Sequence, residues 1–400
     1  MTTNRVFGST LIIAGTTIGA GMLALPLASA GIGFWPATLI MCGIWLLMVY
    51  TAMLMLEVHQ HAPADATLHT LAYQFLGKKG RYLATFAVLF LFYALCAAYI
   101  AGGGSQFNDK INAWFHIEQH TWGTVFFTVV IALVVSIGTH SVDIVNRVLF
   151  TLKIIALVIM LTLLMPHVHI KNLMAMPLQQ GLLLSSLPVI FTSFGFHGSI
   201  PSIVQYVGKD IKALRKIMIF GSALPLFVYL LWQVAIQGIF TQAELFGSSG
   251  LSQFMSTISQ ALQTPMVNKA VTVFADLALA TSFLGVSLGL FDFIADSLSR
   301  NRSTGHRLQV ALITFVPPLG FALFYPKGFI TALGYAAIAL TILAVFMPVA
   351  MVWAKRRQYV ANDDYVVKGG KAALVLVVLL GCGIIGSQFL QMLGLIPAVG

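Results

Sequence analysis

Long apolar segments follow one another along almost the whole chain, and they constrain its fold more than any other feature. Each run carries few or no charged residues and is about as long as the roughly 20 apolar residues that a helix needs to cross a bilayer. The eleven runs fall at about 6–30, 33–56, 82–106, 121–139, 148–165, 182–206, 217–240, 271–294, 308–325, 329–353 and 373–396. The sequence therefore predicts an all-α integral membrane protein with eleven transmembrane helices.

The composition excludes the other classes of protein. Of 400 residues, 58% are hydrophobic and only 8% are charged, which is too little polarity to cover a water-soluble domain, and a disordered chain is excluded for the same reason. A β-barrel is excluded because its strands alternate and span only about ten residues. The longest connections, about 57–81 and 241–270, leave no room for a soluble domain, so residues 1–400 form one transmembrane domain. The first run has no small-residue cleavage pattern and is interpreted as a retained span.

The basic residues are distributed unevenly between the two sides of the predicted membrane. With the N-terminus in the cytoplasm, 18 of the 22 Lys and Arg residues fall on the cytoplasmic side. The four on the outside are Lys110, Lys171, Lys269 and Lys327. This bias predicts a cytoplasmic N-terminus and an external C-terminus, and it explains the formal net charge of +10 without a nucleic-acid partner.

The first span contains a glycine-rich interruption. AGTTIGAGMLALP, residues 14–26, carries Gly15, Gly19 and Gly21 with Thr16 and Thr17 between them. Close helix packing of the GxxxG kind is one interpretation, since Gly15 and Gly19 fit that spacing. A broken helix in the middle of the bilayer is the other.

The sixth span carries a second interruption at a similar depth. FTSFGFHGSIPS, residues 191–202, contains Gly195 and is followed by Pro201, as Gly21 is followed by Pro26. The two interrupted spans, the first and the sixth, are five spans apart, which suggests two repeats of five spans each. An odd number of spans per repeat forces the second repeat to be inverted relative to the first, a pattern typical of secondary transporters. Backbone freed at such breaks is tolerated only where it lines a cavity. Both breaks are therefore expected to face one central site.

The breaks predict the chemistry of that site. Amides near Gly19, Ala20 and Gly21 suit a carboxylate, and free carbonyls around the breaks suit an ammonium group, so the ligand is a zwitterionic α-amino acid. Aromatic side chains near the breaks stack on a planar ligand or simply pack in the core. The predicted substrate-binding residues are Thr16, Thr17, Ile18, Gly19, Ala20, Gly21, Tyr93, Tyr99, Phe191, Thr192, Ser193, Phe194, Gly195, Phe196 and His197.

Ionisable residues inside the spans are candidates for proton coupling. Lys153 and Asp276 each lie inside an apolar run, where a charge costs on the order of 3 kcal/mol. The alternatives are that Lys153 snorkels to the cytoplasmic interface and that Asp276 pairs with a neighbouring helix. Thr281 and Ser282 are hydroxyls that suit Na⁺, although such groups commonly bond back to their own helix.

Neither a metal site nor an enzyme is predicted. The three cysteines lie in apolar runs and read as packing residues, and the histidines lack a zinc-binding spacing. No pair of acids and no nucleophile with a base lies in the predicted bilayer region. The chain is thus expected to act without a cofactor, driven by an ion gradient.

Four segments together resemble a known family. They are GTTIGAGMLALPLASAGIGF, EVHQHAPAD, PVIFTSFGFHGSIPSIV and FADLALATSFLGVSLGLFDF. They are similar to the bacterial hydroxy and aromatic amino acid permeases of the amino acid/polyamine/organocation superfamily. The likeness runs from about residue 4 to the C-terminal GLIPAVG.

The resemblance implies a LeuT-like core with repeats at about 6–165 and 182–353, broken helices 1 and 6, and an extra helix at about 373–396. It implies import of L-tyrosine across the bacterial inner membrane by proton symport and alternating access, with a periplasmic C-terminus and Lys153 near the first break. It makes Na⁺ at Thr281 and Ser282 less favoured. Tryptophan or broader aromatic specificity, and an amino acid sensor, remain alternatives. No motif marks the residue that recognises a phenolic hydroxyl, and no oligomeric state is predicted.

Overall fold

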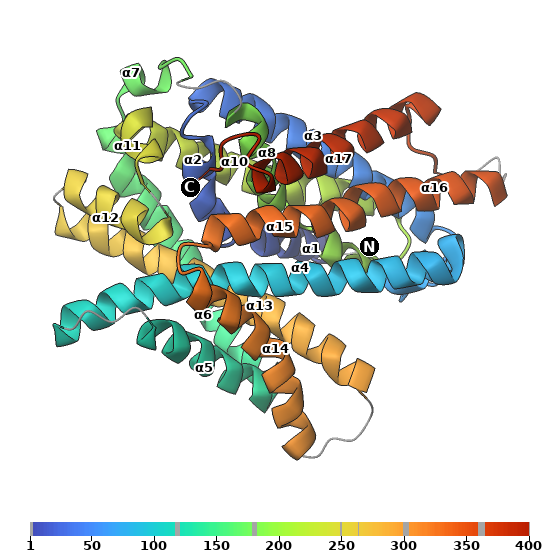
Figure 1. The fold of residues 1–400 in the computed structure, drawn as a ribbon. Helices are drawn as coiled ribbons and strands as arrows, with labels where there is room; N and C mark the ends of the chain where they lie inside the picture. The colour runs from blue at the N-terminus through green and yellow to red at the C-terminus, as the bar shows by residue number, and fades with distance from the viewer. Residues whose placement is uncertain are drawn as a thin grey trace.

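The computed structural model describes residues 3–116, 121–177, 182–248, 250–262, 264–298, 304–358 and 365–399. Every regular element in this part of the chain is helical (Figure 1). The elements are α1 (Thr3–Thr17), α2 (Gly21–Ser29), α3 (Phe34–His59), α4 (Leu68–Phe115), α5 (Trp122–Ile137), α6 (Thr139–Leu164), η1 (Met165–His167), α7 (Ile170–Leu173), α8 (Leu182–Ser193), η2 (His197–Ser199), α9 (Ile200–Val207), α10 (Ile211–Ile239), α11 (Gln242–Phe246), α12 (Leu251–Leu262), α13 (Pro265–Leu298), α14 (Thr304–Phe324), α15 (Phe329–Thr341), η3 (Ile342–Phe346), α16 (Met347–Gln358) and α17 (Gly370–Met392).

The helices confirm an integral membrane protein. Among the described residues, nine helices are long and apolar enough to cross a bilayer, and the bent pair α1 and α2 brings the number to ten. The remaining expected span, 121–139, is the helix Trp122–Ile137 of 16 residues. At 1.5 Å per residue this helix is about 24 Å long, shorter than a hydrocarbon core of about 30 Å. Eleven spans therefore stay a prediction.

The third span differs from its predicted bounds. Helix α4 starts at Leu68 inside the expected connection 57–81, and it reaches Phe115. Thr67 caps its first turn by accepting a hydrogen bond of 3.2 Å from the amide of Thr70. At Gly77 the backbone takes φ 68° and ψ −161°, which interrupts the helix before the apolar run begins. A glycine is suited to that turn because an L side chain rarely adopts a positive φ.

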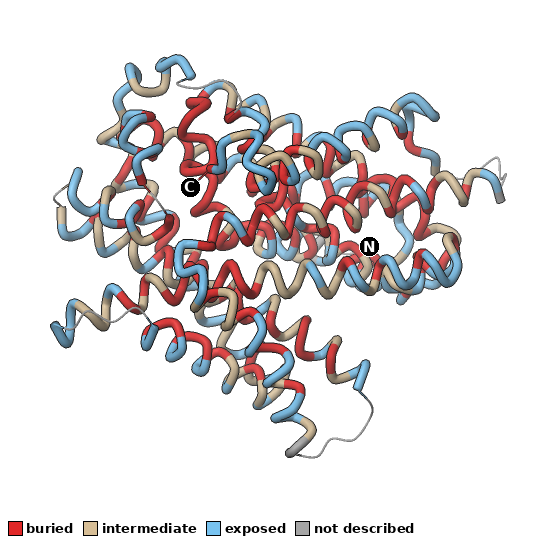
Figure 2. Tube along the Cα trace, in the orientation of Figure 1, coloured by how far each residue is buried: buried red, intermediate tan, exposed pale blue. Residues whose placement is uncertain are grey.

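Burial is concentrated where the broken helices and their neighbours meet, as Figure 2 shows. Helix α4 packs along α15, α6 along α13, and α1 along α10 (Figure 1). Large apolar side chains such as Leu39, Phe86 and Leu133 remain exposed on outer faces. Apolar exposure on this scale is unusual for a soluble protein and is typical of a surface that lipid covers.

A buried ion pair lies at the C-terminal end of α3. Glu57 is fully buried and accepts two hydrogen bonds of 2.8 Å from Arg356 of α16. Its Oε2 also accepts a 2.8 Å bond from the amide of Val367, which precedes α17. Lys355 Nζ lies 4.0 Å from Glu57 Oε1. One carboxylate thus holds together α3, α16 and the segment leading into α17.

Candidate substrate site at two helix breaks

The first predicted break is confirmed as a feature of the backbone. Helix α1 ends at Thr17, α2 begins at Gly21, and the two axes differ in direction by 54°. Thr17 Oγ1 donates a 2.7 Å hydrogen bond to Ile13 O, so the threonine hydroxyl is bonded within the last turn of α1. A GxxxG packing motif alone does not account for this geometry. Within it, however, Gly15 does mark a close contact, because a Cβ there would lie 2.7 Å from Phe150.

The second break also lies where the sequence predicts it. Helix α8 ends at Ser193, a single 3₁₀ turn covers His197–Ser199, and α9 begins at Ile200 just before Pro201. The Gly195 amide donates to Thr192 O at 3.2 Å, which tightens the end of α8. Thr192 Oγ1 donates a 2.9 Å bond to Leu333 O and so fixes this end against α15.

The two breaks meet, and Tyr229 of α10 joins them. Its hydroxyl lies 2.6 Å from Thr17 O and 2.7 Å from Ser193 O, the last residues of α1 and α8. Ser193 Oγ also donates to Gly21 O at 3.1 Å. A single phenolic proton is shared between two carbonyls at the negative ends of two helix dipoles. Tyr229 was not predicted, because a lone tyrosine in an apolar run carries no signal of its partners.

Lys153 lies directly at the first break. Its Nζ donates a 2.8 Å hydrogen bond to Ile18 O and sits 4.7 Å from the centre of the Phe150 ring. The side chain is only 2% exposed, and the residue lies deep within α6, which begins at Thr139. The snorkelling alternative is therefore wrong, because the amine points inward to the unwound backbone and not toward an interface.

Ser282 of α13 also contacts the first break. Its Oγ accepts a 3.0 Å bond from the amide of Ala20, one of the three amides predicted to bind a carboxylate. A Cβ added at Gly19 would lie 2.7 Å from that Oγ, so glycine is needed for the approach. Tyr99 of α4 is buried and its hydroxyl interacts with Ser282. Thr281 instead donates to Leu277 O of its own helix at 2.8 Å.

The aromatic residues divide into two groups. Phe191, Phe194 and Phe196 are buried at the second break, and the Phe194 ring packs edge-on against Tyr229 with centroids 5.2 Å apart. Tyr93 is directed elsewhere: its hydroxyl donates a 2.8 Å bond to Ile313 O of α14. That carbonyl has no amide partner one turn later, because Pro317 occupies the position.

His197 adds a polar group to the second break. Its Nε2 forms a 2.8 Å hydrogen bond with Thr51 Oγ1 of α3, and both side chains are buried. Its Nδ1 is buried with no hydrogen-bond partner in the described part of the chain. In contrast, Thr16, Gly195 and Gly198 keep exposed surface next to these buried groups. The two breaks are therefore not completely enclosed by the protein.

Asp276 lies away from the breaks. Its Oδ2 forms an ion pair with Lys110 near the end of α4, and its Oδ1 is buried without a hydrogen-bond partner among the described residues. This is the pairing with a neighbouring helix that the sequence left open. In the part of the chain that the structure describes, no group of three or more His, Cys, Asp or Glu side chains is arranged to hold a metal ion.

Comparisons with known proteins show the family to which the chain belongs. The model of the tryptophan/tyrosine permease family matches residues 2–388. The chain is 44% identical to the tyrosine-specific transport system 1 of Haemophilus influenzae, over 99% of both chains, and 42% identical to system 2 of that organism, over the full length of both. A tryptophan-specific transport protein of the same organism is 34% identical over 94% of this chain and 93% of its own. The chain therefore belongs to the tryptophan/tyrosine permease family.

Proposed function

We propose that this protein imports L-tyrosine across the bacterial inner membrane by proton symport and alternating access. The observation that carries the proposal is the meeting of two broken helices at one point, with Lys153 bonded to the backbone of the first break. The names of two relatives, 44% and 42% identical and both tyrosine-specific transport systems, support the substrate. A LeuT-like arrangement of eleven spans, with the first and sixth broken and the N-terminus in the cytoplasm, is part of the proposal.

The substrate carboxylate binds at the start of α2. Unwound backbone at Gly19 and Gly21 offers amide groups at the positive end of the α2 dipole. The Ala20 amide already donates to Ser282, so Ser282 must rotate away or share its hydroxyl for this amide to take part. The missing side chains of the two glycines let the carboxylate approach the backbone.

The substrate ammonium group binds the carbonyl ends of α1 and α8. Thr17 O and Ser193 O converge on one hydroxyl, that of Tyr229, and a carbonyl oxygen has two lone pairs. An ammonium group supplies three donors, so it can complete the hydrogen bonding of both carbonyls. The buried phenylalanines of the second break and Tyr99 then form the wall for the aromatic ring.

Proton coupling is assigned to Lys153. A protonated amine next to Ile18 O stabilises the unwound backbone, and loss of the proton weakens that charge-assisted hydrogen bond. The protonation state of Lys153 is thereby linked to the geometry of the carboxylate site, which lies one to three residues further along the chain. Asp276, also predicted to couple protons, is held by Lys110 and is a weaker candidate.

Sodium coupling fits the same residues less well. Thr281 Oγ1 donates to its own helix, and Ser282 Oγ accepts from Ala20. The ammonium group of Lys153 bonds to Ile18, two residues before Ala20, and while it is protonated its positive charge opposes a bound cation.

Tryptophan is the second candidate substrate, because a tryptophan-specific transport protein is 34% identical to this chain. Uptake of labelled L-tyrosine into proteoliposomes, with excess unlabelled tyrosine, tryptophan or phenylalanine, tests the substrate. The proposal predicts saturable uptake. Unlabelled tyrosine is expected to inhibit this uptake at a lower concentration than tryptophan or phenylalanine. Stronger inhibition by tryptophan would assign that substrate instead, and saturable binding without uptake would favour a sensor.

A further inference from the structure

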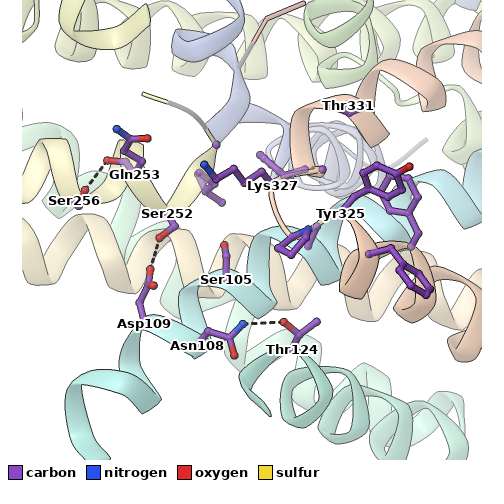
Figure 3. Close-up of a pocket in the computed structure, with 18 of the residues that line it drawn as sticks. Ser105, Asn108, Asp109, Thr124, Ser252, Gln253, Ser256, Tyr325, Lys327 and Thr331 are labelled. Atoms are coloured by element: carbon purple, nitrogen blue, oxygen red, sulfur yellow. Dashed lines mark hydrogen bonds between the residues drawn. The ribbon is translucent and has the colours of Figure 1, made fainter. Parts of the chain in front are cut away.

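A cavity lies at the end of α4 that the basic residues assign to the outside (Figure 3). Its volume is about 1080 Å³, and α4, α12 and the connection between α14 and α15 form its walls. No residue of either break lines it. It is therefore a separate space that the site at the two breaks does not explain.

Charges of both signs face this cavity. Asp109 of α4 and Lys327 of the α14–α15 connection line it from different elements. Asp109 accepts a hydrogen bond from Ser252 of α12, which fixes the carboxylate at the wall. Gly250, at φ 85°, brings the chain before α12 against the aliphatic stem of Lys327. Figure 3 shows the Lys327 side chain extending toward α12, on the side where Ser252 and Gln253 lie.

Aromatic and polar groups complete the lining. Phe321 and Tyr325 stack with ring centroids 5.4 Å apart, and Tyr335 lies on the same lining. Asn108 donates a 3.0 Å hydrogen bond to Thr124 Oγ1 and so joins α4 to α5 (Figure 3). A carboxylate, an ammonium group and aromatic faces in one cavity are complementary to a zwitterion with an aromatic side chain.

Part of the cavity lining is buried and apolar. Ala101, Leu251 and Phe329 belong to the lining, and all three are buried. Next to Ala101, Gly102 packs against Leu251 and Phe329 on one side of α4. Tyr99, less than one helical turn away, interacts with Ser282 at the break. One stretch of α4, residues 99–102, thus contacts both the cavity lining and Ser282 at the break.

We propose that this cavity is a second binding site, which captures an aromatic amino acid on the outside before it moves to the breaks. Lys327 receives the carboxylate, Asp109 the ammonium group, and Phe321, Tyr325 and Tyr335 the ring. The inference rests on the proposed function, since it assigns this cavity the same class of ligand. A phospholipid is the competing occupant. The amino acid is favoured because Phe321, Tyr325 and Tyr335 lie on the same lining as the two charges and suit an aromatic side chain.

Equilibrium binding of labelled L-tyrosine to the full chain in nanodiscs tests the proposal, with uptake measured in parallel in proteoliposomes. Wild-type protein is expected to bind two molecules of tyrosine. Ser105→Trp fills the cavity from α4 and is expected to bind one. Lys327→Gln is expected to weaken the second site about tenfold and to leave the first unchanged, which keeps the test valid if the tryptophan variant does not fold. Lys171→Gln, on an exposed lysine assigned to the same side, is the matched control and should bind two.

The contradicting outcomes are separable. One tyrosine per wild-type chain, unaffected by Lys327→Gln and accompanied by normal uptake, would overturn the second site and leave the proposed function standing. The same result with a phospholipid that copurifies with wild type and is lost from Ser105→Trp would assign the cavity to lipid. Absence of both binding and uptake in wild type would overturn the proposed function itself.

Discussion

The ammonium group of Lys153 donates a 2.8 Å hydrogen bond to the carbonyl oxygen of Ile18, which lies 135 residues earlier in the sequence. The bond joins a regular helix, α6, to the one stretch of α1 and α2 that is not helical. The Lys153 side chain is 2% exposed, and its charge is held against backbone that belongs to no helix. Removal of the Lys153 amine is therefore expected to affect proton coupling more than it affects the rest of the structure.

Substitution Lys153→Ala is expected to abolish proton-driven accumulation of tyrosine. Without the amine, the first break carries no group that gains and loses a proton next to Ile18 O. Accumulation should fall to the level measured without a gradient, while binding and exchange of internal for external tyrosine remain measurable. Lys171→Ala, on an exposed lysine, serves as the control. Undiminished accumulation in Lys153→Ala would remove the residue from the mechanism.

Substitution Gly19→Ala is expected to weaken tyrosine binding about tenfold, equivalent to about 1.4 kcal/mol. A Cβ at this position would lie 2.7 Å from Ser282 Oγ and would displace the group that holds the Ala20 amide. Gly8→Ala is the matched control, since nothing lies within 4 Å of a Cβ there and the residue lies in α1, the helix that precedes the break. Equal affinity of the two variants in a binding assay would show that Gly19 serves packing only.

Removal of one hydroxyl in Tyr229→Phe should leave Thr17 O and Ser193 O without their shared donor. An unsatisfied buried carbonyl costs about 1–3 kcal/mol, so the thermal transition of the purified protein should fall. The uptake rate should fall as well, because the two breaks lose the group that links them. Tyr82→Phe removes an exposed hydroxyl and should match wild type. Unchanged stability and uptake in Tyr229→Phe would mean that the bridge has no part in either.

Substitution Glu57→Gln is expected to destabilise the protein by about 3–5 kcal/mol, the cost of breaking a buried ion pair on one side. The variant leaves Arg356 and Lys355 beside a neutral side chain and weakens the bond to the Val367 amide. Asp143→Asn breaks an exposed pair with Arg147 and should cost less than about 1 kcal/mol. Unfolding in detergent compares the two, and equal losses would contradict a structural role for Glu57.

The sequence predicted features that depend on local composition. Gly19, Gly21 and Gly195 mark both breaks because glycine and proline disturb a membrane helix wherever the chain folds. It did not reveal Tyr229, whose two acceptors are 212 and 36 residues away, nor the hydrogen bond that Ser282 accepts from the amide of Ala20. The inward direction of Lys153 was likewise open, because hydropathy gives depth in the membrane but not the face of the helix. These relations depend on tertiary packing.

Uptake of L-tyrosine under separately imposed gradients shows which ion drives transport. Proteoliposomes would receive either an inward proton gradient or an inward sodium gradient of matched size, with a gradient-free sample as reference. The account predicts accumulation above the reference with the proton gradient and none with sodium. Accumulation driven by sodium, or equal levels in all three samples, would contradict proton symport.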